Sequence, residues 1–202
     1  QHRLTRRPLF VVHNAADHTV SAHRMLPFSA RAKRAIYMGS FMPYKNVETL
    51  VAAAARRPDW EFHFLSRIDT PTRGRLMSVA PHAHLVFHDG TPEAEYQDLL
   101  ATSRALVTSS LDEGFGVPLI EAMAAGTPLV VSDIEIFHEV AGDAALYSHP
   151  KDADGFASAL DQLDRESTWT SRSRASLEQA KKFSWAVSAA RLLDVLDKVG
   201  GT

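Results

Sequence analysis

The stretch that decides the fold is residues 109–128, which read SSLDEGFGVPLIEAMAAGTP. It follows an apolar run at residues 105–108 that we expect to be a strand. Pro118 suits the first turn of a helix, because a proline there removes an N–H that has no intrahelical partner. Gly126 is typical of a helix end, and Pro128 prevents the helix from resuming. The stretch therefore predicts a strand, a glycine-containing turn and a short helix.

The same stretch carries residues suited to bind a ligand. Gly114 and Gly116 flank Phe115, and backbone without a Cβ can approach a ligand closely. Free N–H groups at the helix start, with the positive end of the helix dipole, form an anion site that fits a diphosphate. Glu113 and Glu121 can face one pocket and accept hydrogen bonds from vicinal hydroxyls. Taken alone, each glutamate could equally serve only the helix dipole, an effect of about 0.3–1 kcal/mol.

Outward from this stretch, strand-like and helix-like segments alternate along the chain. This alternation predicts right-handed crossovers and an α/β fold with a doubly wound parallel sheet, Rossmann-like, whose ligands bind beyond the carboxyl ends of the strands. The expected strands are residues 9–12, 35–38, 61–65, 84–87, 105–108, 128–131 and 144–147.

After Pro150 the pattern predicts helices only, at residues 152–164 and 184–199. Ser184 is a suitable N-cap for the second helix, and its apolar positions are expected to form a buried stripe of Trp185, Leu192, Leu193 and Leu196. With no repeat or long linker, residues 1–202 are expected to form a single domain.

Composition excludes several classes of function. A formal net charge of −2 provides no basic excess for a nucleic-acid partner. The absence of cysteine excludes disulfides and thiolate metal sites. No apolar run reaches the roughly 20 residues of a membrane-spanning helix. Because the chain starts without Met and soon enters a strand-like run, we interpret it as part of a longer protein.

Two patterns resemble metal sites, and we expect neither to bind metal. Asp152 and Asp154 form a D-x-D pattern, but they start a helix, where aspartate is favoured as a cap. His82, His84 and His88 are closely spaced without an acidic ligand nearby in sequence. Neither a dinucleotide-binding G-x-G-x-x-G after the first strand nor a Walker-type phosphate loop is present.

Residues 113–128 resemble the E-x7-E signature of retaining glycosyltransferases of the GT-B fold, family 4 (group 1). Four other stretches resemble that family in the same order, and the likeness covers nearly the whole chain from about residue 9. They are residues 37–46, 87–100, 132–145 and 183–185. The resemblance implies the C-terminal, donor-binding half of a two-domain enzyme that uses a nucleoside-diphosphate sugar.

By this resemblance, Glu113 and Lys45 are the expected catalytic residues. Glu113 would contact the donor sugar near the reacting carbon, and Lys45 would neutralise charge on the departing diphosphate. Glu121 would hold the ribose hydroxyls. The expected donor-binding residues are Glu121, Gly114, Phe115, Gly116, Val117, Ser40, Arg67 and Gly90.

One departure from the family affects the diphosphate site. Ser40 stands where many members carry an arginine after the glycine of the first loop, so one cation is missing. Arg67, just beyond the next expected strand, lies at the same edge of the sheet and is our candidate replacement. Ser66 also stands where the family usually has glycine.

The resemblance implies sugar transfer with retention of anomeric configuration and no cofactor or metal. The acceptor, a sugar or a lipid-linked saccharide, would be bound by a missing N-terminal domain. The full protein would be cytoplasmic or peripherally attached to the inner membrane face. Two alternatives stay open: a stand-alone nucleotide-sugar-binding module, and a sugar-nucleotide epimerase of the same fold. A phosphorylase would need a lysine for pyridoxal, which the sequence does not single out.

Overall fold

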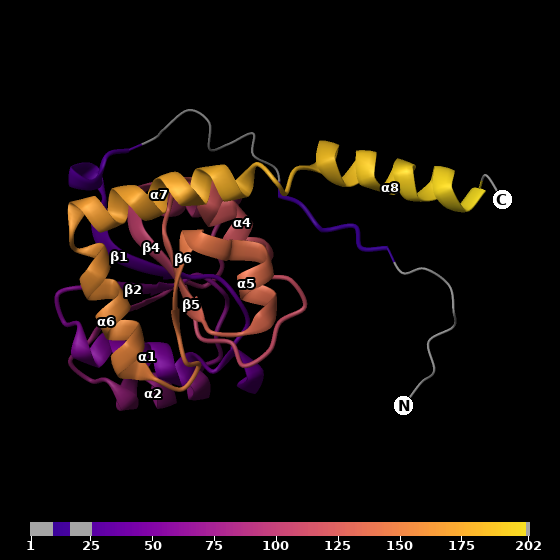
Figure 1. Cartoon of the computed structure of the whole chain (residues 1–202). Coiled ribbons are helices and arrows are strands. Elements are labelled where there is room, and N and C mark those ends of the chain that lie inside the picture. Colours follow the sequence, from indigo (N-terminus) through magenta and orange to yellow (C-terminus); the bar gives the residue numbers. More distant parts are fainter. Residues whose placement is uncertain (1–9, 17–25, 201–202) are drawn as a thin grey trace.

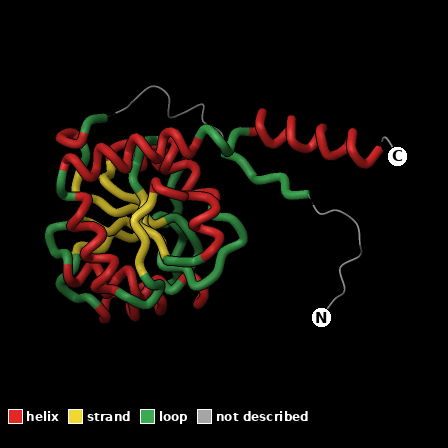
Figure 2. Tube along the Cα trace, in the orientation of Figure 1, coloured by secondary structure: helices red, strands yellow, loops and turns green. Residues whose placement is uncertain are grey.

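The computed structural model describes residues 10–16 and 26–200. The centre of the molecule is a parallel sheet with the strand order β3-β2-β1-β4-β5-β6 (Figures 1 and 2). The order reverses between β1 and β4, which defines a doubly wound α/β sheet and confirms the predicted fold class. The strands are β1 (Ala32–Tyr37), β2 (Glu61–Phe64), β3 (His84–Phe87), β4 (Ser103–Thr108), β5 (Leu129–Ser132) and β6 (Ala145–Ser148).

Six helices cover the two faces of this sheet. The first face packs against α1 (Val47–Arg56), α2 (Thr70–Val79) and α6 (Ala153–Leu163). The second packs against α3 (Glu93–Thr102), α4 (Val117–Ala124) and α5 (Glu135–Ala141). Within the described residues, short 3-10 helices lie in connections: η2 (Phe28–Ala30), η3 (Pro43–Lys45) and η4 (Gly142–Ala144).

Burial explains why these segments fold as they do. In α1, the apolar residues Val47, Leu50, Val51 and Ala54 are all buried, as their spacing predicts. Every residue of β5 is buried, because helices cover the central strands on both faces. Edge strand β3 instead alternates between exposed and half-buried residues.

The first expected strand is wrong. Leu9 lies outside the described residues, and residues 10–12 have no regular secondary structure. A strand needs a neighbour for its backbone hydrogen bonds. This segment instead lies against the start of the last helix, where the Ser188 hydroxyl donates to the carbonyl of His13 at 2.8 Å.

The C-terminal region also differs from expectation. Between the two predicted helices lies α7 (Glu166–Ala180), which the sequence analysis missed because it is mostly polar. The last helix, α8 (Trp185–Gly200), starts as predicted, with the Val187 amide donating to the Ser184 hydroxyl at 3.3 Å. Its expected buried stripe is wrong: Trp185 is 54% exposed and Leu193 62% exposed. The helix projects from the body of the domain (Figure 1). Among the described residues only the segment 10–16 runs beside it, and most of its apolar side chains stay exposed.

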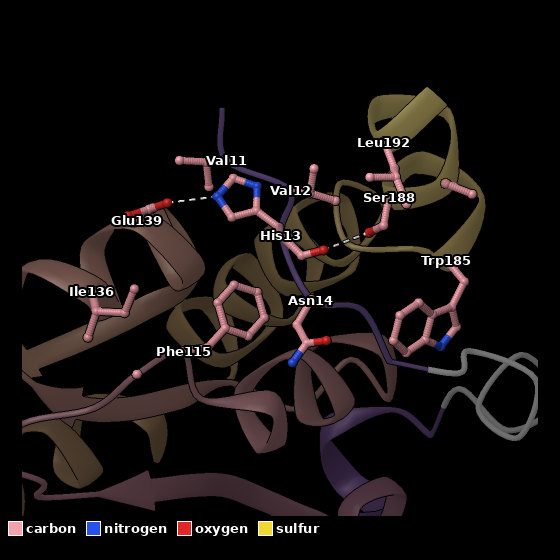
Figure 3. Close-up of a pocket in the computed structure, with 12 residues that line it drawn as sticks. Val11, Val12, His13, Asn14, Phe115, Ile136, Glu139, Trp185, Ser188 and Leu192 are labelled. Atoms are coloured by element: carbon pink, nitrogen blue, oxygen red, sulfur yellow. Dashed lines mark hydrogen bonds and ion pairs between the residues drawn. The ribbon is translucent and has the colours of Figure 1, made fainter. Parts of the chain in front are cut away.

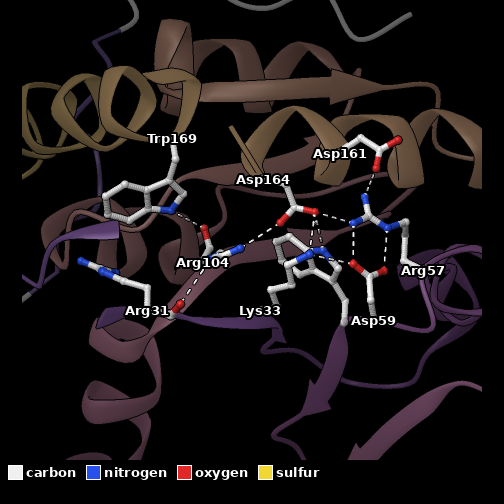
Figure 4. A network of polar contacts seen from close by, with 9 residues as sticks. Arg31, Lys33, Arg57, Asp59, Arg104, Asp161, Asp164 and Trp169 are labelled. Carbon is white, nitrogen blue, oxygen red and sulfur yellow. Dashed lines mark hydrogen bonds and ion pairs between the residues drawn. The ribbon is translucent and has the colours of Figure 1, made fainter. Parts of the chain in front are cut away.

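A charged network fastens the edge of the sheet opposite the carboxyl ends of the strands (Figure 4). The Asp164 carboxylate accepts hydrogen bonds from Arg57 at 2.6 Å, Arg104 at 2.9 Å and Lys33 at 3.1 Å. Burial alone would raise the pKa of Asp164, but the hydrogen bonds from Arg57 and Lys33 lower it overall. Asp164 thus joins the turn after α6 to β1 and β4.

We expect Asp164→Asn to lower the free energy of unfolding at pH 7 by about 1.5–3 kcal/mol, the range for hydrogen bonds to a charged group. Because the folded-state pKa is lowered, this stabilisation is present above the unfolded pKa of about 3.9 and is lost as the pH falls through the folded value. Urea denaturation of the parent protein and of Asp164→Asn from pH 7 to pH 3 measures the difference between their free energies of unfolding. This difference should become smaller as the pH falls.

Asp161→Asn is the matched control, because Asp161 also pairs with Arg57 but its side chain is 67% exposed. We expect it to cost less than about 1 kcal/mol. Equal losses in the two variants would contradict a central role for Asp164.

Candidate functional site

The loops that follow β1 and β4 are fastened to each other at the carboxyl edge of the sheet. Asn46 adopts a left-handed backbone conformation with φ of 52°, which asparagine tolerates better than most residues. Its side-chain amide donates to the Ser109 carbonyl at 3.0 Å, and the Ser109 hydroxyl donates to the Asn46 carbonyl at 2.7 Å. The Leu111 amide donates to the Tyr44 carbonyl at 2.7 Å. These contacts fix the backbone on either side of the expected catalytic residues.

Lys45 and Glu113 meet at this junction. Lys45 Nζ lies 2.5 Å from Glu113 Oε1, and each side chain is 15% exposed. The Ser110 hydroxyl donates to the same oxygen at 2.9 Å. A carboxylate with two donors on one oxygen is held in one orientation, and its other oxygen makes no hydrogen bond to the described residues that would compete with a ligand.

The glycines beside Glu113 have different functions. Gly116 has φ of 93°, and a Cβ there would lie 3.2 Å from the Phe137 ring, so a side chain would be strained and crowded. A Cβ on Gly114 would meet nothing within 4 Å. Gly114 therefore leaves room beside Glu113, whereas Gly116 permits the turn into α4.

The start of α4 borders a small cavity. Lys45, Glu113, Gly116 and Val117 line a space of about 240 Å³. Pro118 occupies the first turn of α4 as predicted and carries no N–H, and the Leu119 amide donates to the Gly116 carbonyl at 2.9 Å. Val117 is therefore the residue of the first turn whose amide the helix itself leaves without a partner. The combination of a lysine ammonium and a helix N-terminus is suited to an anion.

Glu121 lies one turn into α4, on the helix face toward α3. The Tyr96 hydroxyl donates to Glu121 Oε2 at 2.6 Å. Burial raises the pKa of the Glu121 carboxyl, while the bond from Tyr96 opposes that rise by stabilising the charged form. One oxygen of Glu121 is thus occupied, and the other makes no hydrogen bond to the part of the chain that the structure describes.

Arg67 and Ser40 each have a contact of their own near the carboxyl edge of the sheet. Arg67 is exposed and lies beside Gly90, where a Cβ would come within 3.4 Å of Arg67 Nε and where φ is 86°. The carbonyl of Ser40 accepts from the Tyr37 hydroxyl at 2.5 Å. The structure therefore places Arg67 beside Gly90. That Arg67 binds the diphosphate stays a prediction.

The segment before β1 supplies a side chain to the surroundings of Phe115 that the sequence did not predict. His13 stacks on Phe115 with ring centroids 6.0 Å apart, and its Nε2 lies 2.7 Å from Glu139 Oε1 (Figure 3). His13, Phe115 and Glu139 line a hollow of about 800 Å³, together with Trp185 and Leu192 of α8. No local pattern marks His13, because its neighbours read as a strand.

The two metal-like patterns have other contacts. The Asp152 carboxylate caps α6 by accepting from the Gly155 amide at 2.9 Å, and Asp154 pairs with Arg56. His84 is exposed on β3, whereas His88 contacts His63. Within residues 10–16 and 26–200, no group of three or more His, Asp or Glu is arranged to hold a metal ion.

Comparison with known proteins identifies the family. Residues 22–183 match the family described as glycosyl transferases group 1. The chain belongs to this family, as the E-x7-E resemblance implied. The fold agrees: sucrose-phosphate synthase from Thermosynechococcus elongatus superposes with a TM-score of 0.79 at 22% identity, over 94% of this chain and 52% of that one.

Two of the similar proteins are named as mannosyltransferases. O-antigen chain mannosyltransferase B of Escherichia coli is 32% identical over 75% of this chain and 42% of its own length. Phosphatidyl-myo-inositol mannosyltransferase of Mycolicibacterium smegmatis is 30% identical over 86% of this chain and 47% of its own length. The chain therefore spans about half the length of these relatives.

The contact between Tyr96 and Glu121 leads to a prediction about charge. We expect Tyr96→Phe to raise the pKa of the Glu121 carboxyl further, because the variant removes a hydrogen bond to the charged form. Carboxyl ¹³C chemical shifts followed through a pH titration measure this change. Tyr37→Phe is the control, because the Tyr37 hydroxyl donates to Ser40 instead. An unchanged Glu121 pKa in Tyr96→Phe would show that burial alone sets it.

Proposed function

We propose that this chain is the donor-binding part of a glycosyltransferase that moves a sugar from a nucleoside diphosphate to an acceptor with retention of configuration. The observation that carries the proposal is the Lys45–Glu113 pair, held beside the start of α4. It combines an anion site, a cation and a carboxylate, which are the three features that a sugar diphosphate requires. The family to which the chain belongs supports the same reaction class.

In this proposal each charged residue contacts one part of the donor. The diphosphate lies at the N-terminus of α4 and beside Lys45, which leaves its ion pair with Glu113 to neutralise the departing phosphate oxygen. Glu113 accepts hydrogen bonds from the sugar hydroxyls, and Glu121 accepts them from the ribose. The bond from the anomeric carbon to the diphosphate breaks, the acceptor oxygen bonds to that carbon on the same face, and the acceptor proton leaves with the diphosphate.

We propose a mannosyl donor as the first candidate. Both curated relatives described above carry mannosyltransferase in their names. In this proposal Lys45 and the N-terminus of α4 supply positive charge to the diphosphate, with Arg67 as the candidate second cation, and transfer requires no metal or other cofactor. Calorimetry with nucleoside-diphosphate mannose and nucleoside-diphosphate glucose tests the choice of donor, with each base in turn. The same titrations in the presence of EDTA test the absence of a metal requirement.

The acceptor site belongs, in this proposal, to an N-terminal domain outside this chain. The apolar residues of α8 and the hollow of about 800 Å³ beside Phe115 form a surface that such a domain would cover. None of the helices in the described ranges is long and apolar enough to cross a membrane. A cytoplasmic location, with peripheral contact to the inner membrane face for a lipid-linked acceptor, completes the proposal.

The two glutamates should be separable by experiment. We expect Glu121→Ala to weaken nucleoside-diphosphate binding by about 1.5–3 kcal/mol, since it removes hydrogen bonds to a charged group. Glu113→Gln should leave that affinity nearly unchanged and lower turnover of the full protein, because Glu113 faces the sugar and acts in the transition state. Calorimetry and initial rates measure the two effects.

Asp112→Asn is the control for both variants, because Asp112 is the exposed carboxylate next to Glu113 in the sequence. Equal losses of affinity in Glu113→Gln and Glu121→Ala would contradict the division of labour. An epimerase would instead convert the donor sugar without any acceptor, and a binding module would leave it intact even in the full protein.

This chain alone should bind a nucleoside diphosphate with a Kd between about 1 μM and 1 mM, equivalent to roughly −8 to −4 kcal/mol. It should transfer no sugar, because an open site neither positions an acceptor nor excludes water. Incubation with radiolabelled donors and an acceptor panel tests this. Robust transfer by this chain alone would show that the site is complete without a second domain.

A further inference from the structure

The loop formed by residues 112–116 has little backbone support of its own. Among the described residues, no backbone carbonyl accepts a hydrogen bond from an amide of this loop. Free amides suit a ligand, but they leave the shape of the loop to its side chains. Glu113 is held by Lys45 and Ser110. Phe115, between the two glycines, packs against the core on the second face of the sheet.

Three aromatic rings meet at Phe115. His13 stacks on it with ring centroids 6.0 Å apart and 25° between the ring planes. Phe183 meets both rings edge-on, at 5.8 Å from Phe115 and 5.7 Å from His13, an arrangement that aromatic pairs favour. Phe183 is buried, whereas the His13 side chain is 40% exposed. The Phe115 ring thus contacts one ring from the core and one from the segment before β1.

His13 is itself held by two helices. Its Nε2 lies 2.7 Å from Glu139 Oε1 of α5 (Figure 3). A carboxylate only accepts hydrogen bonds, so Nε2 carries the hydrogen. On the other side, the Ser188 hydroxyl of α8 donates to the His13 carbonyl at 2.8 Å. The imidazole therefore cannot turn away from Phe115 without breaking its bond to Glu139.

We propose that His13 is a positioning residue for the donor sugar, which acts through Phe115 on the backbone of Gly114 and Gly116 beside Glu113. This inference rests on the proposed function, in which Glu113 binds the sugar. The groups that would hold the diphosphate and the ribose, Lys45 and Glu121, are fixed by other contacts. Loss of His13 should therefore affect the sugar and spare the nucleotide.

Glu139 gives a second reason for this role. It borders, with Glu113, a space of about 290 Å³. His13 occupies one oxygen of Glu139 and so fixes which lone pairs of that carboxylate face the space. Both carboxylates are then oriented by a donor, Glu113 by Lys45 and Glu139 by His13. A sugar in this space would meet fixed acceptors for its hydroxyls.

The test compares the affinity of this chain for free and sugar-linked nucleotides. The probes are ADP, GDP and UDP, each free and joined to mannose or glucose, and calorimetry gives each Kd. His13→Ala should raise the Kd of the sugar donor roughly three- to tenfold, the size of one aromatic contact. The Kd of the free diphosphate should change by less than about twofold. A role confined to stability would lower the Tm of the variant and leave this difference between the two ligands unchanged.

Val12→Ala is the matched control, because Val12 is the neighbour of His13 and lines the same hollow without an aromatic ring. It should change neither Kd. Glu139→Ala tests the same path from α5 and keeps the inference testable if His13→Ala does not fold. Because the two residues act through one contact, the double variant should lose no more sugar affinity than Glu139→Ala alone.

Two results would overturn this inference and leave the proposed function standing. One is an equal loss of sugar-donor and free-diphosphate affinity in His13→Ala, or no loss of either. The other is a double variant whose loss is the sum of the two single losses. A parent protein that binds none of the probes overturns the proposed function and this inference together.

Discussion

Strands β1 and β4 pair in parallel at the centre of the sheet, although β2 and β3 lie between them in sequence. The chain leaves β1 toward α1 on one face and leaves β4 toward α4 on the other, so the two loops diverge above adjacent strands. Lys45 reaches the crevice from the first loop and Glu113 from the second. The site depends on this pairing, because no local segment contains both residues.

The loops are rigid at this point for a physical reason. Asn46 and Ser109 exchange hydrogen bonds, and Leu111 donates to Tyr44, so the backbone around both charges is fixed before a ligand arrives. Lys45 and Glu113 neutralise each other in the absence of ligand, which limits the cost of partly burying them. A diphosphate and a sugar would exchange that single pair for two matched contacts, and little protein reorganisation would be needed.

The sequence predicted the features that depend on local chemistry. Alternating segments and turn residues located six of the seven expected strands, and Gly116 and Pro118 marked the start of α4. Sequence patterns gave wrong predictions where tertiary contacts determine the structure. Residues 10–12 have strand-like side chains but lie beside α8 instead of a free strand edge, and α7 is polar yet packs through Trp169 and Ser176. The contacts of His13 with Phe115, and of His63 with His88, join distant segments and leave no sequence pattern.

The apolar stripe of α8 is exposed, although its sequence pattern predicted that it would be buried. Apolar periodicity predicts that a helix face is buried, but it does not say against what. Here Leu192 lines the same hollow as Gly114 and Phe115, so the uncovered face and the reacting end of the site are continuous. Glu113 is nearly buried by its own loop, yet the space beside Gly114 opens toward that hollow. If the donor sugar binds beside Gly114 as we propose, a surface that covered α8 would also exclude water from that sugar, where electrostatic stabilisation has most effect. Completion of the apolar interface and completion of the catalytic site would then be one event.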